Sequence, residues 1–255
     1  FAMLRNQTDL WVVPFLLLAG NLLAVVWAYC NIIFKLKYRF THVTLSDILR
    51  DIKRASGFFF ARIASTVYST SNTVLLQAFS PSGSSIGFFT SADRVFAAAK
   101  GAVAPVSDSL YPYMVKHRNF KTIRRMLLIF EPVVLLGVGL TAWQAEPLCR
   151  LVFGTDYTPV APILRAFLPA IALLLPSYVL GFPSLGALGK IRLANLSIFL
   201  GMSMHLIGMV FLVISGMISA TALAWLTSIS EGVIFAFRLY CVLHYKNKLK
   251  GTAIE

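Results

Sequence analysis

The stretch IGFFTSADRVFAAAKGAVAPVSDSLYPYM, residues 86–114, has the length and apolar content of a membrane span but carries charges inside it. Asp93, Arg94 and Lys100 have apolar residues on both sides. A basic side chain at the bilayer centre costs roughly 3 kcal/mol on insertion scales, so such residues normally face a protein interior or a water-filled pathway. We interpret the stretch as a transporter helix that handles an anionic ligand.

The rest of the chain has the composition of a membrane protein. Of its 255 residues 58% are hydrophobic and 13% charged, and the mean hydropathy is +0.76, outside the range of ordinary soluble domains. A bilayer span needs about 20 mostly apolar residues. The sequence therefore predicts an all-α polytopic membrane protein with seven transmembrane helices, at Leu10–Phe34, Gly57–Phe79, Ile86–Tyr113, Met126–Trp143, Ala161–Phe182, Leu193–Ser215 and Ile218–Leu243.

Lysine and arginine are distributed unevenly between the polar joints. They concentrate after the first, third and fifth spans and at the end of the chain, whereas the opposite joints carry only Arg5, Arg150 and Arg165. Because basic residues of short loops stay on the cytoplasmic side, we expect a cytoplasmic C-terminus. The net charge of +13 then reflects topology and contact with anionic membrane lipids, and we expect no nucleic-acid partner.

An amphipathic pattern separates the first span from the other six. Thr44 can cap a helix with Asp47 three residues on, and its apolar face would contain Leu45, Ile48, Leu49 and Ile52. We expect a helix on the cytoplasmic leaflet, which serves either as an interdomain linker or as a surface anchor.

Polar side chains of the second span share one helical face. They are Arg62, Ser65, Thr66, Ser69, Asn72 and Thr73. Hydroxyls and an amide near an arginine can bind sugar hydroxyls or phosphate oxygens. The same small polar residues also suit close helix packing, but the arginine favours a cavity-lining face.

The third span continues this polar pattern. Asp93 and Lys100 lie on one side, about 10 Å apart along the axis, which is too far for a tight pair. We expect their charges to be available to a ligand, with pairing to other helices as the alternative. Pro105 predicts a kink beside a run of small residues.

The remaining ionisable residues give weaker signals. Glu231 in the last span is either a proton or cation site or a partner in an ion pair. His205 lies mid-span, and we interpret it as a packed, hydrogen-bonded side chain rather than a proton site. The cysteines and histidines have no metal-site or CxxC spacing, so we expect no metal site, no disulfide and no catalytic residue.

Four motifs resemble the second half of bacterial polysaccharide (O-antigen) flippases of the Wzx type, in the multidrug/oligosaccharidyl-lipid/polysaccharide exporter superfamily. They are ARIASTVYSTSNT (61–73), IGFFTSADRVFAA (86–98), PVSDSLYPY (105–113) and EPLCRLVFGTDY (146–157). Members of this family consist of two six-helix bundles. The resemblance implies that residues 1–34 hold the last helix of a truncated first bundle, 35–54 a cytoplasmic amphipathic linker and 55–255 the six-helix C-terminal bundle. The opening residues agree, because they show neither an initiator methionine nor a signal peptide.

The resemblance also implies a substrate and a location. The substrate would be an undecaprenyl-diphosphate-linked oligosaccharide that crosses the bacterial inner membrane by alternating access through a basic cavity. Expected contacts with the substrate are Arg62, Ser69, Asn72, Asp93, Arg94 and Lys100, and Asp108 or Glu231 would couple transport to a proton or sodium gradient. We expect no cofactor beyond such a gradient; membrane lipids, a polysaccharide polymerase and other assembly proteins are the expected partners.

Two other classes of protein are the alternatives. An ion-coupled exporter of cationic small molecules, like the MATE drug antiporters, would share the architecture, but its cavity should be richer in carboxylates. A membrane enzyme acting on prenyl-linked sugars would need catalytic acid–base or metal groups, and the short joints contain no DxD, paired carboxylates or histidine cluster.

Overall fold

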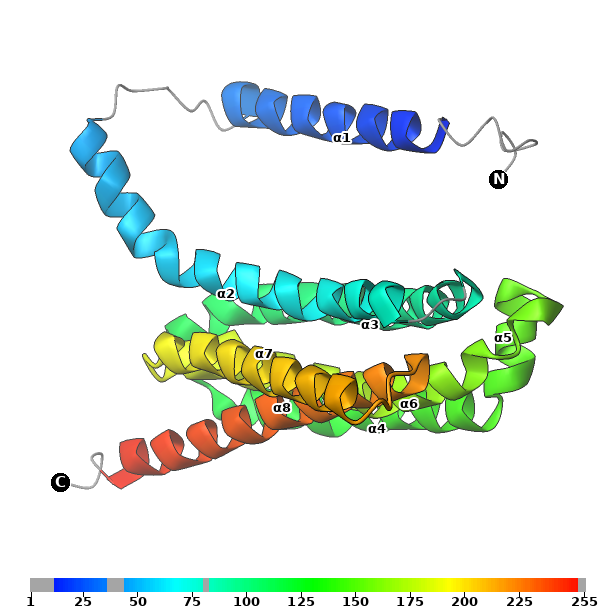
Figure 1. Ribbon diagram of the computed structural model, residues 1–255. Coiled ribbons are helices and arrows are strands. Elements are labelled where there is room, and N and C mark those ends of the chain that lie inside the picture. Colours follow the sequence, from blue (N-terminus) through cyan, green and yellow to red (C-terminus); the bar gives the residue numbers. More distant parts are fainter. Residues whose placement is uncertain (1–11, 36–43, 80–82, 252–255) are drawn as a thin grey trace. The chain divides into compact units, whose positions relative to one another are not determined.

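The computed structural model describes residues 12–35, 44–79 and 83–251 (Figure 1). All regular structure in these ranges is helical, which confirms the predicted all-α class. The helices are α1 (Val12–Cys30), η2 (Asn31–Lys35), α2 (Leu45–Phe79), α3 (Gly83–His117), α4 (Phe120–Trp143), α5 (Ala145–Phe153), η3 (Thr155–Tyr157), α6 (Val160–Val179), η4 (Leu180–Leu185), α7 (Ile191–Ile214) and α8 (Ala220–Gly251).

The chain divides into two compact units, Phe1–Lys53 and Arg54–Glu255. In the first unit, α1 is apolar and continues into the π-helical turn η2. Its large side chains, such as Phe15, Leu23 and Trp27, are exposed. Side chains of this kind are suited to contact with lipid.

Five helices in the described ranges have the length and apolar content of a membrane span. They coincide with five of the seven predicted spans: Pro14–Lys35, Phe120–Trp143, Val160–Leu185, Ile191–Ile214 and Ala220–Lys246. The other two predicted spans lie in α2 and α3, each 35 residues long. At 1.5 Å per residue each extends for about 50 Å, longer than a bilayer is thick, but both carry several polar and charged residues.

The predicted amphipathic helix is continuous with the second span. Helix α2 begins at Leu45, and the carbonyl of Thr44 accepts hydrogen bonds from the amides of Asp47 and Ile48, as expected for a helix start. No helix-breaking proline separates this amphipathic start from the polar stripe that follows, so one helix contains both. The expected amphipathic helix is thus the first part of α2.

Helix α6 forms the centre of the second unit. It packs against α3, α4 and α8, while α7 covers another side of α8. Phe167 of α6 stacks on Phe96 of α3 with ring centroids 5.2 Å apart and also contacts Phe89, and all three rings are buried. The three rings fill the interface between α3 and α6, and buried alanines such as Ala166 and Ala170 leave room for close packing on α6.

Prolines lie within both α3 and the α6–η4 segment, but only the second leaves the regular α-helical path. Helix α3 stays continuous through Pro105 and Pro112. By contrast, α6 passes into the π-helical segment η4, where Gly181 has a non-helical ψ of −119°. An added Cβ on Gly181 would lie 3.1 Å from Nη1 of Arg238, so a larger residue there would press on that guanidinium.

The joint after α4 is helical, which the sequence did not suggest. Helices α5 and η3 lie between α4 and α6. Arg165 on α6 links this joint to α4, because its Nε donates to the carbonyl of Ala142 at 3.1 Å and its Nη1 lies 3.5 Å from Glu146 Oε1.

Candidate functional site

Helix α3 has a face packed against α6 and an exposed face. Phe89, Ala92 and Phe96 are buried against α6. Arg94 is exposed and Asp93 is partly exposed. At 100° per residue Arg94 lies opposite the packed face, whereas Asp93 and Lys100 fall beside Phe89 and Phe96 at the edge of that face.

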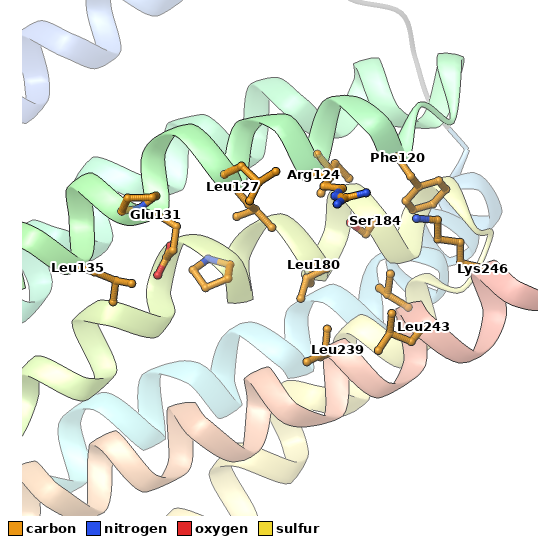
Figure 2. Close-up of a pocket in the computed structure, with 15 residues that line it drawn as sticks. Phe120, Arg124, Leu127, Glu131, Leu135, Leu180, Ser184, Leu239, Leu243 and Lys246 are labelled. Atoms are coloured by element: carbon orange, nitrogen blue, oxygen red, sulfur yellow. The ribbon is translucent and has the colours of Figure 1, made fainter.

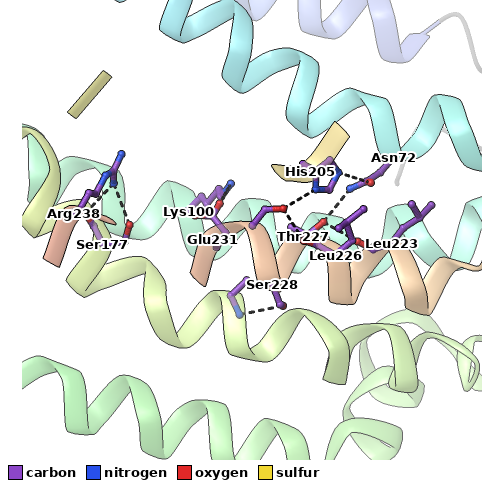
Figure 3. A network of polar contacts seen from close by, with 12 residues as sticks. Asn72, Lys100, Ser177, His205, Leu223, Leu226, Thr227, Ser228, Glu231 and Arg238 are labelled. Atoms are coloured by element: carbon purple, nitrogen blue, oxygen red, sulfur yellow. Dashed lines mark hydrogen bonds and ion pairs between the residues drawn. The ribbon is translucent and has the colours of Figure 1, made fainter. Parts of the chain in front are cut away.

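Lys100 pairs with Glu231 across the helix interface. Its Nζ lies 2.8 Å from Glu231 Oε1 and 4.3 Å from the centre of the Phe96 ring, and Figure 3 shows the pair between α3 and α8. The Glu231 side chain is 7% exposed and that of Lys100 26%, so the glutamate is the more deeply buried partner. The structure thus brings together a residue predicted to bind substrate and a residue predicted to couple ions.

A buried hydrogen-bond network links α2, α7 and α8. His205 Nε2 lies 2.9 Å from Asn72 Oδ1, and its Nδ1 lies 3.1 Å from Ser230 Oγ (Figure 3). Asn72 Nδ2 donates to Thr227 Oγ1 at 3.0 Å, and Thr227 Oγ1 donates onward to the carbonyl of Leu223. Because the amide oxygen of Asn72 accepts from His205, the geometry fits the Nε2–H tautomer. His205 is therefore a packed, hydrogen-bonded side chain, as predicted.

Arg238 anchors a second polar contact within the bundle. Its Nε donates to Ser197 Oγ on α7 at 2.8 Å, and its Nη1 donates to the carbonyl and hydroxyl oxygens of Ser177 on α6 at 2.9 and 3.1 Å. Arg238 is buried. One guanidinium on α8 thereby links three helices, because its planar donors point in fixed directions.

Comparisons with known proteins support the sequence-based resemblance. Residues 1–117, which contain all of α3, match the family model described as polysaccharide biosynthesis protein. A putative O-antigen transporter from Shigella dysenteriae is 24% identical over 166 residues, which are 64% of this chain and 42% of that protein. The resemblance to Wzx-type polysaccharide flippases is thereby confirmed. The matched region covers less than half of the relative's length. No solved structure matches the chain.

These comparisons also bear on the enzyme alternative. The curated relative is named a transporter, and the matching family is one of polysaccharide biosynthesis. Both similarities agree with the prediction that the chain is not an enzyme. In the described ranges no group of three or more His, Cys, Asp or Glu side chains is arranged to hold a metal ion.

The other predicted site residues of this flippase-like chain are dispersed. Asp108 is exposed on α3, and its neighbour Ser107 is buried and donates to the carbonyl of Tyr178 at 3.3 Å. Arg62 and Ser69 belong to α2, but their side chains lie outside the described part of the structure. Asn72 is buried among protein partners.

Sequence reasoning missed two features of this region. Ser177 and Ser197, which bind Arg238, are single hydroxyls in apolar spans and gave no pattern of their own. Glu131 carries a buried Oε2 atom without a hydrogen-bond partner and lines a groove beside α4. A carboxyl group inside an otherwise apolar span was the available signal for that residue.

Proposed function

We propose that this chain forms the last helix of one bundle and the whole second bundle of a flippase for undecaprenyl-diphosphate-linked oligosaccharide. On this proposal α1, α2, α3, α4, α6, α7 and α8 all cross the bacterial inner membrane, with the C-terminus cytoplasmic as the distribution of lysine and arginine indicates. The family match, the relative named as an O-antigen transporter and five apolar helices support it.

The exposed side of α3 that bears Arg94 is the observation that carries the proposal. Arg94 lies in the N-terminal half of a long helix whose opposite side is packed against α6. An arginine that faced acyl chains would cost several kcal/mol, roughly 3 on insertion scales. We infer that this side faces a hydrated basic cavity between two bundles, where the guanidinium binds the diphosphate or an acidic sugar.

The polar face of α2 would complete the cavity. Arg62 and Ser69 fall on one helical face with Asn72, and we assign them to sugar and phosphate binding. The amide of Asn72 is bonded to His205 and Thr227 in this structure. It would reach a substrate only after α2 shifts relative to α7 and α8, as alternating access requires.

The Lys100–Glu231 pair suggests how ion coupling operates. While Glu231 is ionised it holds Lys100 at 2.8 Å. Protonation of Glu231 would remove the negative partner and leave the lysine charge to a phosphate oxygen. We propose this exchange as the coupling step, with Asp108 as the other candidate for binding a proton or sodium ion.

Export in cells tests the proposal. The complete gene carrying Arg94→Ala, Lys100→Ala or Glu231→Gln would be expressed in a strain that lacks it. Lipid-linked oligosaccharide in the inner leaflet and polysaccharide at the cell surface would then be measured. We expect about tenfold less surface polysaccharide for Arg94→Ala, the loss of one charge-assisted bidentate contact of roughly 1.4 kcal/mol or more.

Arg125→Ala is the matched control, because Arg125 is also exposed but lies near the start of α4 and not on α3. Immunoblots of membranes would check that all variants are present at the same level. Wild-type export by Arg94→Ala and Lys100→Ala would overturn the basic-cavity mechanism. Wild-type dependence on the ion gradient in Glu231→Gln would overturn the coupling step alone.

A further inference from the structure

A groove of about 480 Å³ lies on the side of the second unit formed by α4, α6, η4 and α8 (Figure 2). Its walls are mainly apolar, with Leu127 and Leu135 from α4, Leu180 from η4, and Leu239 and Leu243 from α8. Helices α4 and α8 both pack on α6, and the groove lies between them. Its volume is typical of a pocket for one small molecule or one hydrocarbon chain.

The groove has a charged mouth at one end. Arg124, near the start of α4, and Lys246, near the end of α8, both line it there. The ammonium group of Lys246 lies 5.3 Å from the centre of the Phe120 ring, a cation–π contact that holds it beside the mouth. Two cations therefore lie where an apolar groove opens, a pattern complementary to one anionic group attached to a chain.

Glu131 restricts how deep in the groove an anionic group can bind. It follows Arg124 by seven residues on the same helix, which places it about 10 Å farther along the axis. It lines the same groove, and its Oε2 is buried without a hydrogen-bond partner. An anionic headgroup at this depth would meet the carboxyl group and no cation, so the charges favour a headgroup at the mouth and only a chain beyond it.

We propose that this groove binds an anionic phospholipid, with its phosphate between Arg124 and Lys246 and one acyl chain along the apolar walls. The basic mouth lies at the end of the bundle where lysine and arginine concentrate. Anionic lipids attract such residues by about 1 kcal/mol per lysine or arginine near the membrane surface. The bound chain fills space between α4 and α8 and so stabilises their spacing.

The substrate's own prenyl chain fits these observations less well. The groove-lining residues come from α4, α6, η4 and α8, whereas Arg94 and Lys100 lie on α3. A diphosphate that travelled along the groove would pass the carboxyl of Glu131, which repels it when ionised. A phospholipid stays in its own leaflet and never meets that barrier.

Native mass spectrometry of the purified, detergent-solubilised protein tests the proposal. The protein would be mixed with equimolar phosphatidylglycerol and phosphatidylcholine of the same chain length. We expect phosphatidylglycerol to be retained about fivefold more than phosphatidylcholine, which corresponds to roughly 1 kcal/mol. This preference should disappear in the double variant Arg124→Ala/Lys246→Ala and persist in the charge-conserving Arg124→Lys/Lys246→Arg.

The double variant Lys121→Ala/Arg125→Ala is the matched control, since it removes two exposed charges from the same end of α4 but neither residue lines the groove. Leu127→Trp should reduce retention of both lipids by filling the groove. The proposal is overturned if Arg124→Ala/Lys246→Ala retains the preference, or if the Lys121/Arg125 control loses it equally. Displacement of phosphatidylglycerol by an equimolar prenyl diphosphate would assign the groove to the substrate chain instead. None of these readouts depends on transport.

Discussion

Helices α3 and α4 are neighbours in sequence and both contain proline. They differ in whether the ionisable side chains within the span have partners on other helices. Helix α3 keeps Lys100 inside the bundle beside Glu231 of α8. Helix α4 exposes leucine and valine along most of its length and buries only Ile123 among its described side chains. Its one acidic residue, Glu131, has an oxygen without a partner. A membrane helix keeps charges within its span where a second helix supplies partners, and helix α8 supplies them to α3.

Breaking the ion pair of α3 should have the largest effect on stability. Lys100→Met leaves Glu231 buried without its partner and should lower the free energy of unfolding by about 3 kcal/mol. Glu231→Gln should cost less, because the Lys100 side chain is 26% exposed and can reach water. The double variant Lys100→Met/Glu231→Met should regain part of the loss. Reversible unfolding in mixed detergent micelles gives all three values; equal costs for both single variants would contradict this account.

Arg238 is a second case of a buried charge with partners, because this residue of α8 donates hydrogen bonds to α6 and α7. Arg238→Lys should cost about 2 kcal/mol, since one ammonium cannot reproduce the planar arrangement that donates to both Ser177 and Ser197. The same unfolding assay measures it. Arg192→Lys, an exposed change on α7, is the control and should be neutral.

Glycine-to-alanine substitutions should have different effects at a packed helix interface and on the open surface of α4. A Cβ on Gly201 of α7 would lie 2.4 Å from side-chain atoms of Ile234 on α8, whereas one on Gly137 of α4 meets nothing within 4 Å. Gly201→Ala should destabilise by about 1–2 kcal/mol, and Gly137→Ala should be neutral or slightly stabilising. If Gly137→Ala proved the more harmful, the surface of α4 would have to be packed against another protein.

The last prediction concerns the short helix α5, which follows α4. It is a difference in the rate of cysteine labelling, with no expected change in stability. Burial raises the pKa of the Cys149 thiol, an effect that the nearby positive charge of Arg165 only partly offsets, so little reactive thiolate is present at pH 8. In a variant without the other cysteines, Cys149 should react with a membrane-impermeant maleimide about tenfold more slowly than an introduced Leu151→Cys, whose parent side chain is 83% exposed. Fast labelling of Leu151→Cys in intact spheroplasts would also place α5 outside the membrane, whereas labelling only after lysis would reverse the proposed orientation.

The length of the apolar stretches was sufficient to predict most of the helices, because the energetic requirement behind it is local. Any segment that crosses a bilayer must be apolar and must satisfy its own backbone hydrogen bonds, so the apolar spans of α6, α7 and α8 could be placed from sequence to within three residues, whereas α4 begins six residues earlier than predicted. The helical joint α5 was missed because its nine residues are too few to give a clear periodic signal.

The sequence could not show in the same way which polar side chains pair with one another. The sequence distinguished Lys100, Glu231, His205 and Asn72 as polar residues in apolar surroundings, and left ligand binding or pairing open for most of them. The separations in sequence between these partners exceed 100 residues for Lys100–Glu231 and Asn72–His205, so no local pattern links them.

The amino-acid sequence by itself determined that this chain is helical, enters a membrane and resembles the polysaccharide flippases, because composition and helical period act on each segment separately. Only the tertiary structure decided which polar side chains meet, that Glu231 holds Lys100, and that a groove with a basic mouth lies between α4 and α8. These features depend on how α3, α4 and α8 are arranged around α6, which is set by the packing of side chains distant in sequence.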